Sequence, residues 1–191
     1  LIGSVPPAME PATVRTVAIH ALMAGCKPEY LPVVLGALEL MLRDEFNMNG
    51  VQGTMHGVAP LMIVNGPYAQ KIGIHGGNGC FGPSFRANAT IGRAIRLILM
   101  NVGGAWPGRG DMATQGSPAK FSYCIAENEE LSPWEPMRAG DTVTVYGGEP
   151  PHNVNDHVAT TAAAVMAALA SSLAPLAAAG SRSTAAAAIA P

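Results

Sequence analysis

The feature that most constrains the fold is a glycine-rich stretch that runs without a break into an apolar helix. It reads HGGNGCFGPSFRANATIGRAIRLILMN over residues 75–101, with four glycines, Cys80 and Arg86 ahead of the helix. Apolar residues recur at helical spacing over residues 90–102, which predicts a helix that buries one face. The loop before it is then either an ordinary glycine turn or the mouth of a ligand site.

Composition bounds the class of protein. The chain has 191 residues, of which 49% are hydrophobic and 5% aromatic, so we expect one main domain with an aliphatic core. The formal net charge is −2 and the basic residues are scattered, which argues against nucleic acid as a partner. No stretch is apolar enough for a membrane span and the first residues lack the order of a signal peptide, so we expect a soluble, cytoplasmic protein.

The three cysteines are far apart in the chain and form no CxxC pair. This spacing fits neither a disulfide framework nor a structural zinc ribbon, so free thiols in a reducing compartment are expected.

The apolar pattern alternates between helical and strand periods. Helices are expected over residues 13–24, ended by Gly25, within residues 26–46, and over residues 67–72. Strands are expected within residues 51–57 and 59–66, and then within 120–127 and 141–148, with a long loop over 103–118. The sequence therefore predicts an α/β (or α+β) fold in which helices cover two sides of a small mixed sheet.

The chain divides into two parts by composition. Residues 1–158 are expected to form a single globular α/β domain. Residues 159–191 are rich in Ala, Ser and Pro, which predicts a helix over 160–173 and an appendage that is helical or disordered beyond residue 174.

The glycine-rich loop offers an anion site. Backbone N–H groups at the N-terminus of the next helix, with Asn88 or Thr90 as N-cap, favour a negative group, and Arg86 adds positive charge. Arg93 and Arg96 are expected on the solvent face of the helix. The pattern is neither a P-loop nor a dinucleotide fingerprint, and an ordinary turn is the alternative.

Among the thiols, Cys26 is the best candidate for reactivity. It lies at the junction of two helices beside Lys27, where a thiolate would be stabilised, although small junctions also bury cysteine as an apolar residue. Cys124 is expected in the core of a strand, and Cys80 is expected to be accessible.

Histidines and carboxylates supply further candidates. His56 is either a general base or a satisfied turn histidine. The spacing of His152, Asp156 and His157 matches no standard ligand set, so these are weak candidates for a metal site, and no cofactor is predicted. The acidic residues of the polar segment either form a solvated loop or face the arginines of the glycine-rich stretch; they are Glu127, Glu129, Glu130 and Glu135.

Several blocks together resemble one family. MAGCKPEYLPVVLGALELML, TMHGVAPLMIVNGP, CFGPSFRANATIGRAIRLILMNVGGAWPG and KFSYCIAENEELSPWEP with PHNVNDH are similar, in this order, to the C-terminal region of the UGSC-motif family of bacterial selenoproteins and their cysteine homologues. The resemblance implies thiol or selenol chemistry and an upstream domain with a selenocysteine-Gly-Ser-Cys motif, which is absent here. The position of Cys80 is variable in that family, and the Ala-rich tail has no counterpart in it.

These observations favour a thiol-dependent enzyme, an oxidoreductase or a lyase, that acts on a small anionic substrate. Cys26 would be the nucleophile or redox thiol and His56 the proton carrier. The expected substrate-binding residues are Asn65, Gly79, Arg86, Asn88, Thr90, Glu127, Asn128 and Glu129.

Two other hypotheses stay open. The chain is alternatively a non-catalytic domain that caps a redox partner domain or forms a homo-oligomer, since a small domain does not always cover its own apolar helices. A metal-dependent hydrolase built on His152, Asp156 and His157 ranks below both.

Overall fold

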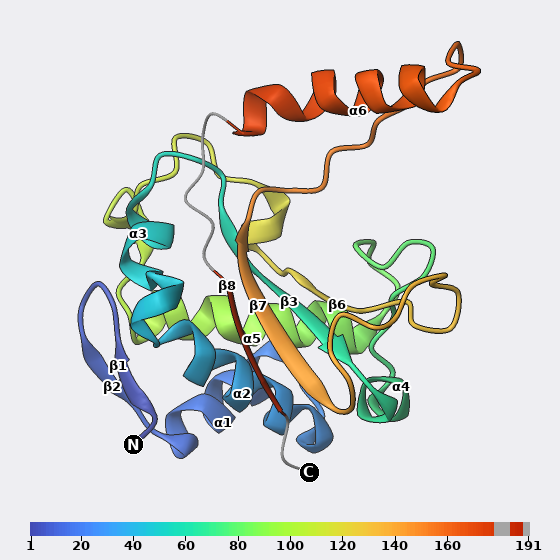
Figure 1. Ribbon diagram of the computed structural model, residues 1–191. Helices are drawn as coiled ribbons and strands as arrows, with labels where there is room; N and C mark the ends of the chain where they lie inside the picture. The colour runs from blue at the N-terminus through green and yellow to red at the C-terminus, as the bar shows by residue number, and fades with distance from the viewer. Residues whose placement is uncertain (178–183, 189–191) are drawn as a thin grey trace.

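A four-stranded mixed sheet forms the centre of the computed structural model, which describes residues 1–177 and 184–188 (Figure 1). The strands are β3 (Ala59–Asn65), β6 (Cys124–Ala126), β7 (Thr142–Gly148) and β8 (Thr184–Ala188), and their order is β6-β3-β7-β8. Strand β3 pairs parallel to β6 and antiparallel to β7, which pairs antiparallel to β8. The predicted α/β (or α+β) class with a small mixed sheet is confirmed.

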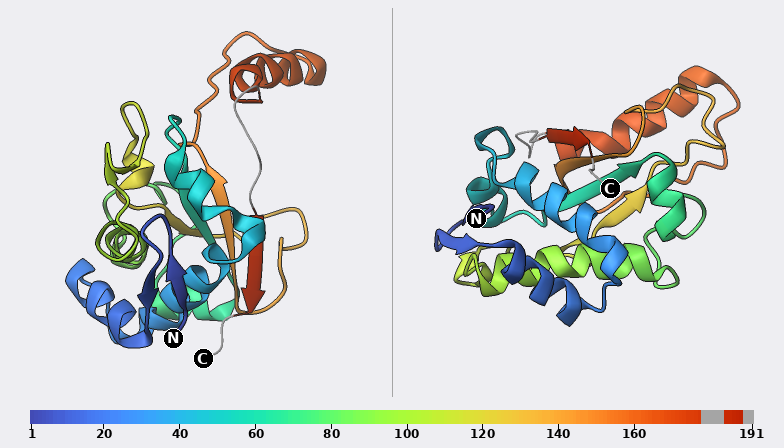
Figure 2. Two further views of the ribbon diagram at one scale, coloured as in Figure 1. Left: turned by 90° about the vertical axis from the view of Figure 1, so that its left-hand side faces the viewer. Right: turned by 90° about the horizontal axis from the view of Figure 1, so that it is seen from below.

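Three long helices lie on one face of this sheet (Figure 2). Helices α2 (Leu31–Met41) and α5 (Arg86–Asn101) contact the strands, and α1 (Val14–Ala24) packs outside them, chiefly on α5. The other face carries loops and a small apolar cluster of Ala59, Ala119 and Tyr123. The long helices of the body therefore cover one side of the sheet, where the sequence had predicted two.

The main core lies between the sheet and these helices. Side chains alternate along a strand, so paired residues such as Met62 and Cys124 share the face that meets the helices. Both are buried, together with Val143 and Val145 of β7. The prediction that Cys124 is a strand core residue is confirmed.

Local signals explain most helix boundaries. The side chain of Thr13 caps α1 by accepting from the Thr16 N–H, and Gly25 ends the helix with φ of 88°, a conformation that glycine adopts cheaply. Helix α4 (Pro67–Ile72) matches its prediction.

The strand predicted within residues 51–57 is wrong. Helix α3 (Met48–Gly53) occupies part of this stretch, because Asn47 caps it by accepting from the Gly50 N–H and because Val51 and Gln52 are both buried. The N-cap outweighed the short apolar run.

The remaining short elements are two small strand pairs and three 3₁₀ turns. Strands β1 (Gly3–Val5) and β2 (Glu10–Ala12) form an antiparallel hairpin, and β4 (Trp106–Pro107) pairs with β5 (Gly110–Asp111) inside the loop predicted at 103–118. The 3₁₀ turns are η1 (Pro28–Tyr30), η2 (Asp44–Phe46) and η3 (Pro118–Lys120).

The Ala-rich tail forms helix α6 (Ala162–Ala177), which stands away from the body (Figure 1), followed by strand β8. The helix predicted over residues 160–173 is present. The rest of the predicted tail, residues 178–183 and 189–191, lies outside the described residues. No helix among the described residues has the length and apolar character to cross a membrane.

The crossover from β3 through α5 to β6 positions the candidate site. Because β3 and β6 are parallel, their carboxyl ends meet at one edge of the sheet, where the N-terminus of α5 also lies. We call this the carboxyl edge; Asn65 and Glu127 mark it. His56 precedes β3 and lies at the opposite end of that strand.

Candidate functional site

The glycine-rich loop is held closed by Asn88 of α5. The Asn88 side chain accepts from the His75 N–H at 2.9 Å and donates to the carbonyls of His75 at 2.8 Å and Cys80 at 3.2 Å. Helix α5 begins at Arg86, with Phe85 as N-cap, so Asn88 and Thr90 lie inside the helix. The predicted N-cap role of Asn88 or Thr90 is therefore wrong, and Asn88 instead fixes the loop.

The other predicted anion-binding groups also make internal hydrogen bonds. Arg86 donates through Nε and Nη2 to the Gly25 carbonyl at 3.1 and 3.0 Å, and Thr90 Oγ1 donates to the Arg86 carbonyl at 2.8 Å. In the loop, the Gly82 N–H donates to the carbonyl of Gly79, which has φ of 76°. The first turn of α5 thus joins the α1–α2 junction to the loop.

A pocket of about 410 Å³ lies beside this loop, within the size range of small-molecule sites. One wall is the loop and the first turn of α5, and the other is the segment leading into β6. Its lining is mostly apolar, with thiol, hydroxyl and amide groups among aromatic rings: Cys80, Phe81, Gly82, Pro83, Asn88, Ala89, Pro118, Phe121, Ser122 and Cys124. The loop is therefore a pocket wall.

A cation lies next to the lining of this pocket. The Arg93 guanidinium stacks over the Phe121 ring at 4.1 Å from its centroid. Among the described residues Arg93 forms no ion pair, in contrast to Arg96 one turn further on. Of the three arginines in α5, Arg86 and Arg96 already donate to protein oxygens, which leaves Arg93 as the arginine available to a negative group near the pocket.

The three thiols gather around the first turns of α5. Burial raises the pKa of the Cys26 thiol, which is 8% exposed; a hydrogen bond with Thr90 and the charge of Arg86 oppose this rise. Burial also raises the pKa of Cys124, and nearby Cys26 adds to that effect. The sequence favoured a stabilised thiolate at Cys26 beside Lys27, but Lys27 lies 3.8 Å from Glu29 and the pKa of Cys26 moves the other way.

Cysteine alkylation tests this ordering. We expect Cys80, which is only partly buried, to react first in the native protein, while Cys26 and Cys124 react slowly near neutral pH. Because their pKa values are raised, their thiolate fraction and alkylation rate should keep rising well above the pH at which an exposed cysteine levels off. Mass spectrometry of each cysteine against time and pH measures this, and faster labelling of Cys26 than of Cys80 would contradict it.

The carboxyl edge joins three of the predicted binding residues to one another. Asn65 Nδ2 donates to Glu127 Oε2 at 2.5 Å and to Glu129 Oε1 at 2.8 Å, and Glu129 Oε1 also accepts from the Gly66 N–H. Glu127 further accepts from the Met137 N–H at 3.0 Å. These carboxylates brace the segment after β6 against the end of β3, and they do not face the arginines.

Asn128, between the two carboxylates, contributes a backbone carbonyl that accepts from the Ser132 N–H at 3.1 Å. The segment after β6 is thus held partly by its own backbone.

His56 lies far from Cys26. It precedes β3, a strand of seven residues whose two ends are about 20 Å apart. Cys26 lies close to Arg86 and Thr90 at the start of α5, which is at the other end of this strand. The His56 Nδ1 lies 3.2 Å from Glu149 Oε1, beside a separate pocket of about 460 Å³. The structure therefore does not bring His56 and Cys26 together as a catalytic pair.

The three weak candidates for metal ligands are exposed, and the carboxylate among them already accepts hydrogen bonds from its own loop. Asp156 Oδ1 accepts from the N–H groups of Val158 and Ala159, which lower the pKa of this carboxyl. His152 and His157 are exposed in the same loop. Over residues 1–177 and 184–188, no group of three or more His, Cys, Asp or Glu side chains is arranged to hold a metal ion.

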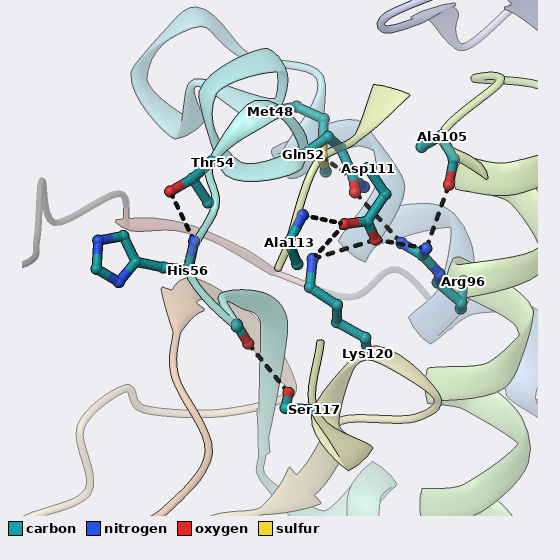
Figure 3. A network of polar contacts seen from close by, with 11 residues as sticks. Met48, Gln52, Thr54, His56, Arg96, Ala105, Asp111, Ala113, Ser117 and Lys120 are labelled. Carbon is teal, nitrogen blue, oxygen red and sulfur yellow. Dashed lines mark hydrogen bonds and ion pairs between the residues drawn. The ribbon is translucent and has the colours of Figure 1, made fainter. Parts of the chain in front are cut away.

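A buried ionic network, which the sequence did not indicate, lies against α5 (Figure 3). Arg96 is 8% exposed, so its predicted place on the solvent face is wrong. Its Nη2 donates to Asp111 Oδ2 at 2.6 Å, and Lys120 Nζ donates to both Asp111 oxygens at 3.0 and 3.2 Å. Gln52 Oε1 accepts from Arg96 Nη1 at 3.2 Å. In Figure 3 the His56 ring points away from this network.

Burial acts on both ends of the Lys120–Asp111 pair. It lowers the pKa of Lys120, although Asp111 opposes that change. Burial alone would raise the pKa of Asp111, but hydrogen bonds from Lys120 and the Ala113 N–H, with the charges of Lys120 and Arg96, lower it overall. Asp111 is therefore ionised between two cations.

Comparison of the chain with protein-family models, with curated proteins and with solved structures finds no match to any of them.

Proposed function

We propose that this chain is a thiol-dependent enzyme domain that acts on a small anionic substrate in the pocket beside the glycine-rich loop. The observation that carries the proposal is that two thiols, Cys80 and Cys124, line one pocket of about 410 Å³, with Cys26 close to Cys124. The resemblance to the UGSC-motif family supports the same class of chemistry.

The anionic character of the substrate rests on Arg93. Its guanidinium stacks on Phe121, a lining side chain, and binds no carboxylate among the described residues. Arg86 and Asn88 are bound to backbone groups, so Arg93 takes the anchoring role that the sequence gave to them. The rings of Phe81 and Phe121 suit the apolar part of the same molecule.

The chemistry assigned to the pocket is nucleophilic. The Cys80 sulfur forms a bond to an electrophilic carbon or sulfur of the substrate, the thiol proton passes to water, and the leaving group departs with the bonding electron pair. Cys80 takes this role because it is the thiol of the pocket that is partly exposed, while Cys26 and Cys124 are buried.

A pair of small electrophiles tests both parts of the proposal. Iodoacetate and iodoacetamide alkylate a thiol by the same displacement of iodide, but only iodoacetate carries a negative charge. We expect the ratio of the iodoacetate rate to the iodoacetamide rate to be roughly 5- to 10-fold higher for Cys80 than for the free thiol of glutathione, because a charge-assisted contact with Arg93 favours the anionic reagent. Mass spectrometry assigns the labelled residue.

The matched variants are Arg93→Gln and Arg138→Gln, since Arg138 is exposed in the segment after β6. The first should abolish the preference and the second should retain it, while Cys80→Ser should remove the label. A ratio of the two rates equal to that of glutathione, or a preference that survives Arg93→Gln, overturns the proposal.

A further inference from the structure

We propose that the cavity lined by Arg96 and Lys120 binds one small monovalent anion such as chloride. This site is separate from the pocket beside the glycine-rich loop, and it rests on the charge balance, the vacant donors and the size of the cavity.

The network carries one uncompensated positive charge. Arg96 and Lys120 share a single carboxylate, that of Asp111, and their side chains are 9% and 10% exposed against 4% for Asp111. Across residues 1–177 and 184–188, no second carboxylate forms an ion pair with either cation. Burying a net charge is costly unless a counter-charge accompanies it.

The hydrogen-bond count leaves donors for a ligand. Lys120 Nζ has three hydrogens, and both of its described acceptors are oxygens of the single Asp111 carboxylate. Arg96 has five N–H groups, and its described partners are Gln52 Oε1, the Ala105 carbonyl and Asp111 Oδ2. Both cations therefore retain N–H groups beyond those that the described residues accept.

A cavity lies against these cations. Its volume is about 10 Å³, and its polar lining comes from Gln52, Arg96 and Lys120, with apolar walls from residues such as Ile95 and Leu99. This volume suits a single atom or a water molecule and excludes a carboxylate or phosphate. Water would accept hydrogen bonds but would leave the positive charge uncompensated. A halide ion both accepts hydrogen bonds and neutralises the charge, so chloride is the better occupant.

Replacement of chloride by gluconate at constant ionic strength tests the site. Gluconate is too large for the cavity, so the unfolding midpoint of the full chain should be higher in chloride by roughly 3 °C, as binding to the folded state alone predicts. Lys120→Met leaves a balanced Arg96–Asp111 pair and should remove the difference. Lys71→Met, at an exposed lysine, should keep it.

Equal midpoints of the full chain in the two salts overturn the proposal, as does a chloride effect that Lys120→Met retains. If Lys120→Met does not fold, anomalous diffraction from bromide-soaked crystals of the unchanged chain decides. A bromide peak in the cavity, next to the side chains of Arg96 and Lys120, supports the site, and a cavity without that peak overturns it.

Discussion

Asp111→Asn should destabilise the folded chain by about 3 kcal/mol, because it leaves Arg96 and Lys120 buried without their shared carboxylate. The substitution keeps the size of the side chain, so the loss reports on charge rather than on packing. For a chain of this length the expected fall in the unfolding midpoint is roughly 6–12 °C. Urea and thermal unfolding followed by circular dichroism measure both quantities.

The change in stability of the Asp111→Asn variant with pH gives an independent test of the same network. Asp111 raises the pKa of Lys120, so its removal lowers that pKa further below the value in the unfolded chain. The unfolded state then binds more protons than the folded state over a wider range, and stability rises with pH there. The loss in free energy of unfolding of the variant, relative to the unchanged chain, should therefore shrink as pH increases towards the ordinary lysine pKa.

The matched control is Asp44→Asn, at an exposed aspartate, which should change stability by less than about 0.5 kcal/mol. A deficit for Asp111→Asn as small as that of the control would mean that the network contributes little.

Sequence patterns predicted the elements that local signals define. Gly25 at the end of α1, the short helix α4 and the strands β3 and β7 follow from capping, proline placement and apolar alternation. Such signals act within a few residues, so one sequence is enough to find them. The strand predicted within residues 51–57 was wrong because the side chain of Asn47, just before that stretch, caps helix α3 instead.

The candidate site was harder to predict because its partners are distant in sequence. Asn88 and Arg86 have the residue types of substrate anchors, yet their hydrogen bonds go to His75, Cys80 and Gly25, which only the fold brings near. Residue type indicates what a side chain can bind, and the fold decides what it does bind.

The buried network left one weak signal in the sequence. Asp111 is the only acidic residue in the loop over residues 103–118, and Arg96 follows Gly92 by one helical turn. A lone charge in a long loop gains meaning only once Lys120 and Arg96 are known to converge on it, a contact across 9 to 15 positions of the chain.

Gly92→Ala should strongly destabilise the folded chain although it adds a single carbon atom, since Gly92 is where α5 meets the segment leading into β6. A Cβ at Gly92 would lie 2.5 Å from the Tyr123 backbone nitrogen and in contact with Ser122 Oγ. Ser122 cannot turn aside freely, because its hydroxyl hydrogen-bonds the carbonyls of Asn88 and Ala89 at 3.1 and 2.9 Å. The backbone of one element must therefore shift.

We expect Gly92→Ala to lower the free energy of unfolding by about 3 kcal/mol, because overpacking against backbone outweighs the roughly 1 kcal/mol that alanine gains in a helix. Gly53→Ala in α3 is the control: its added Cβ meets nothing within 4 Å, so stability should be unchanged or rise. Since Ser122 and Cys124 line the pocket, the shift should also speed alkylation of Cys124. Equal unfolding free energies for the two variants would show that α5 and β6 approach less closely than this contact requires.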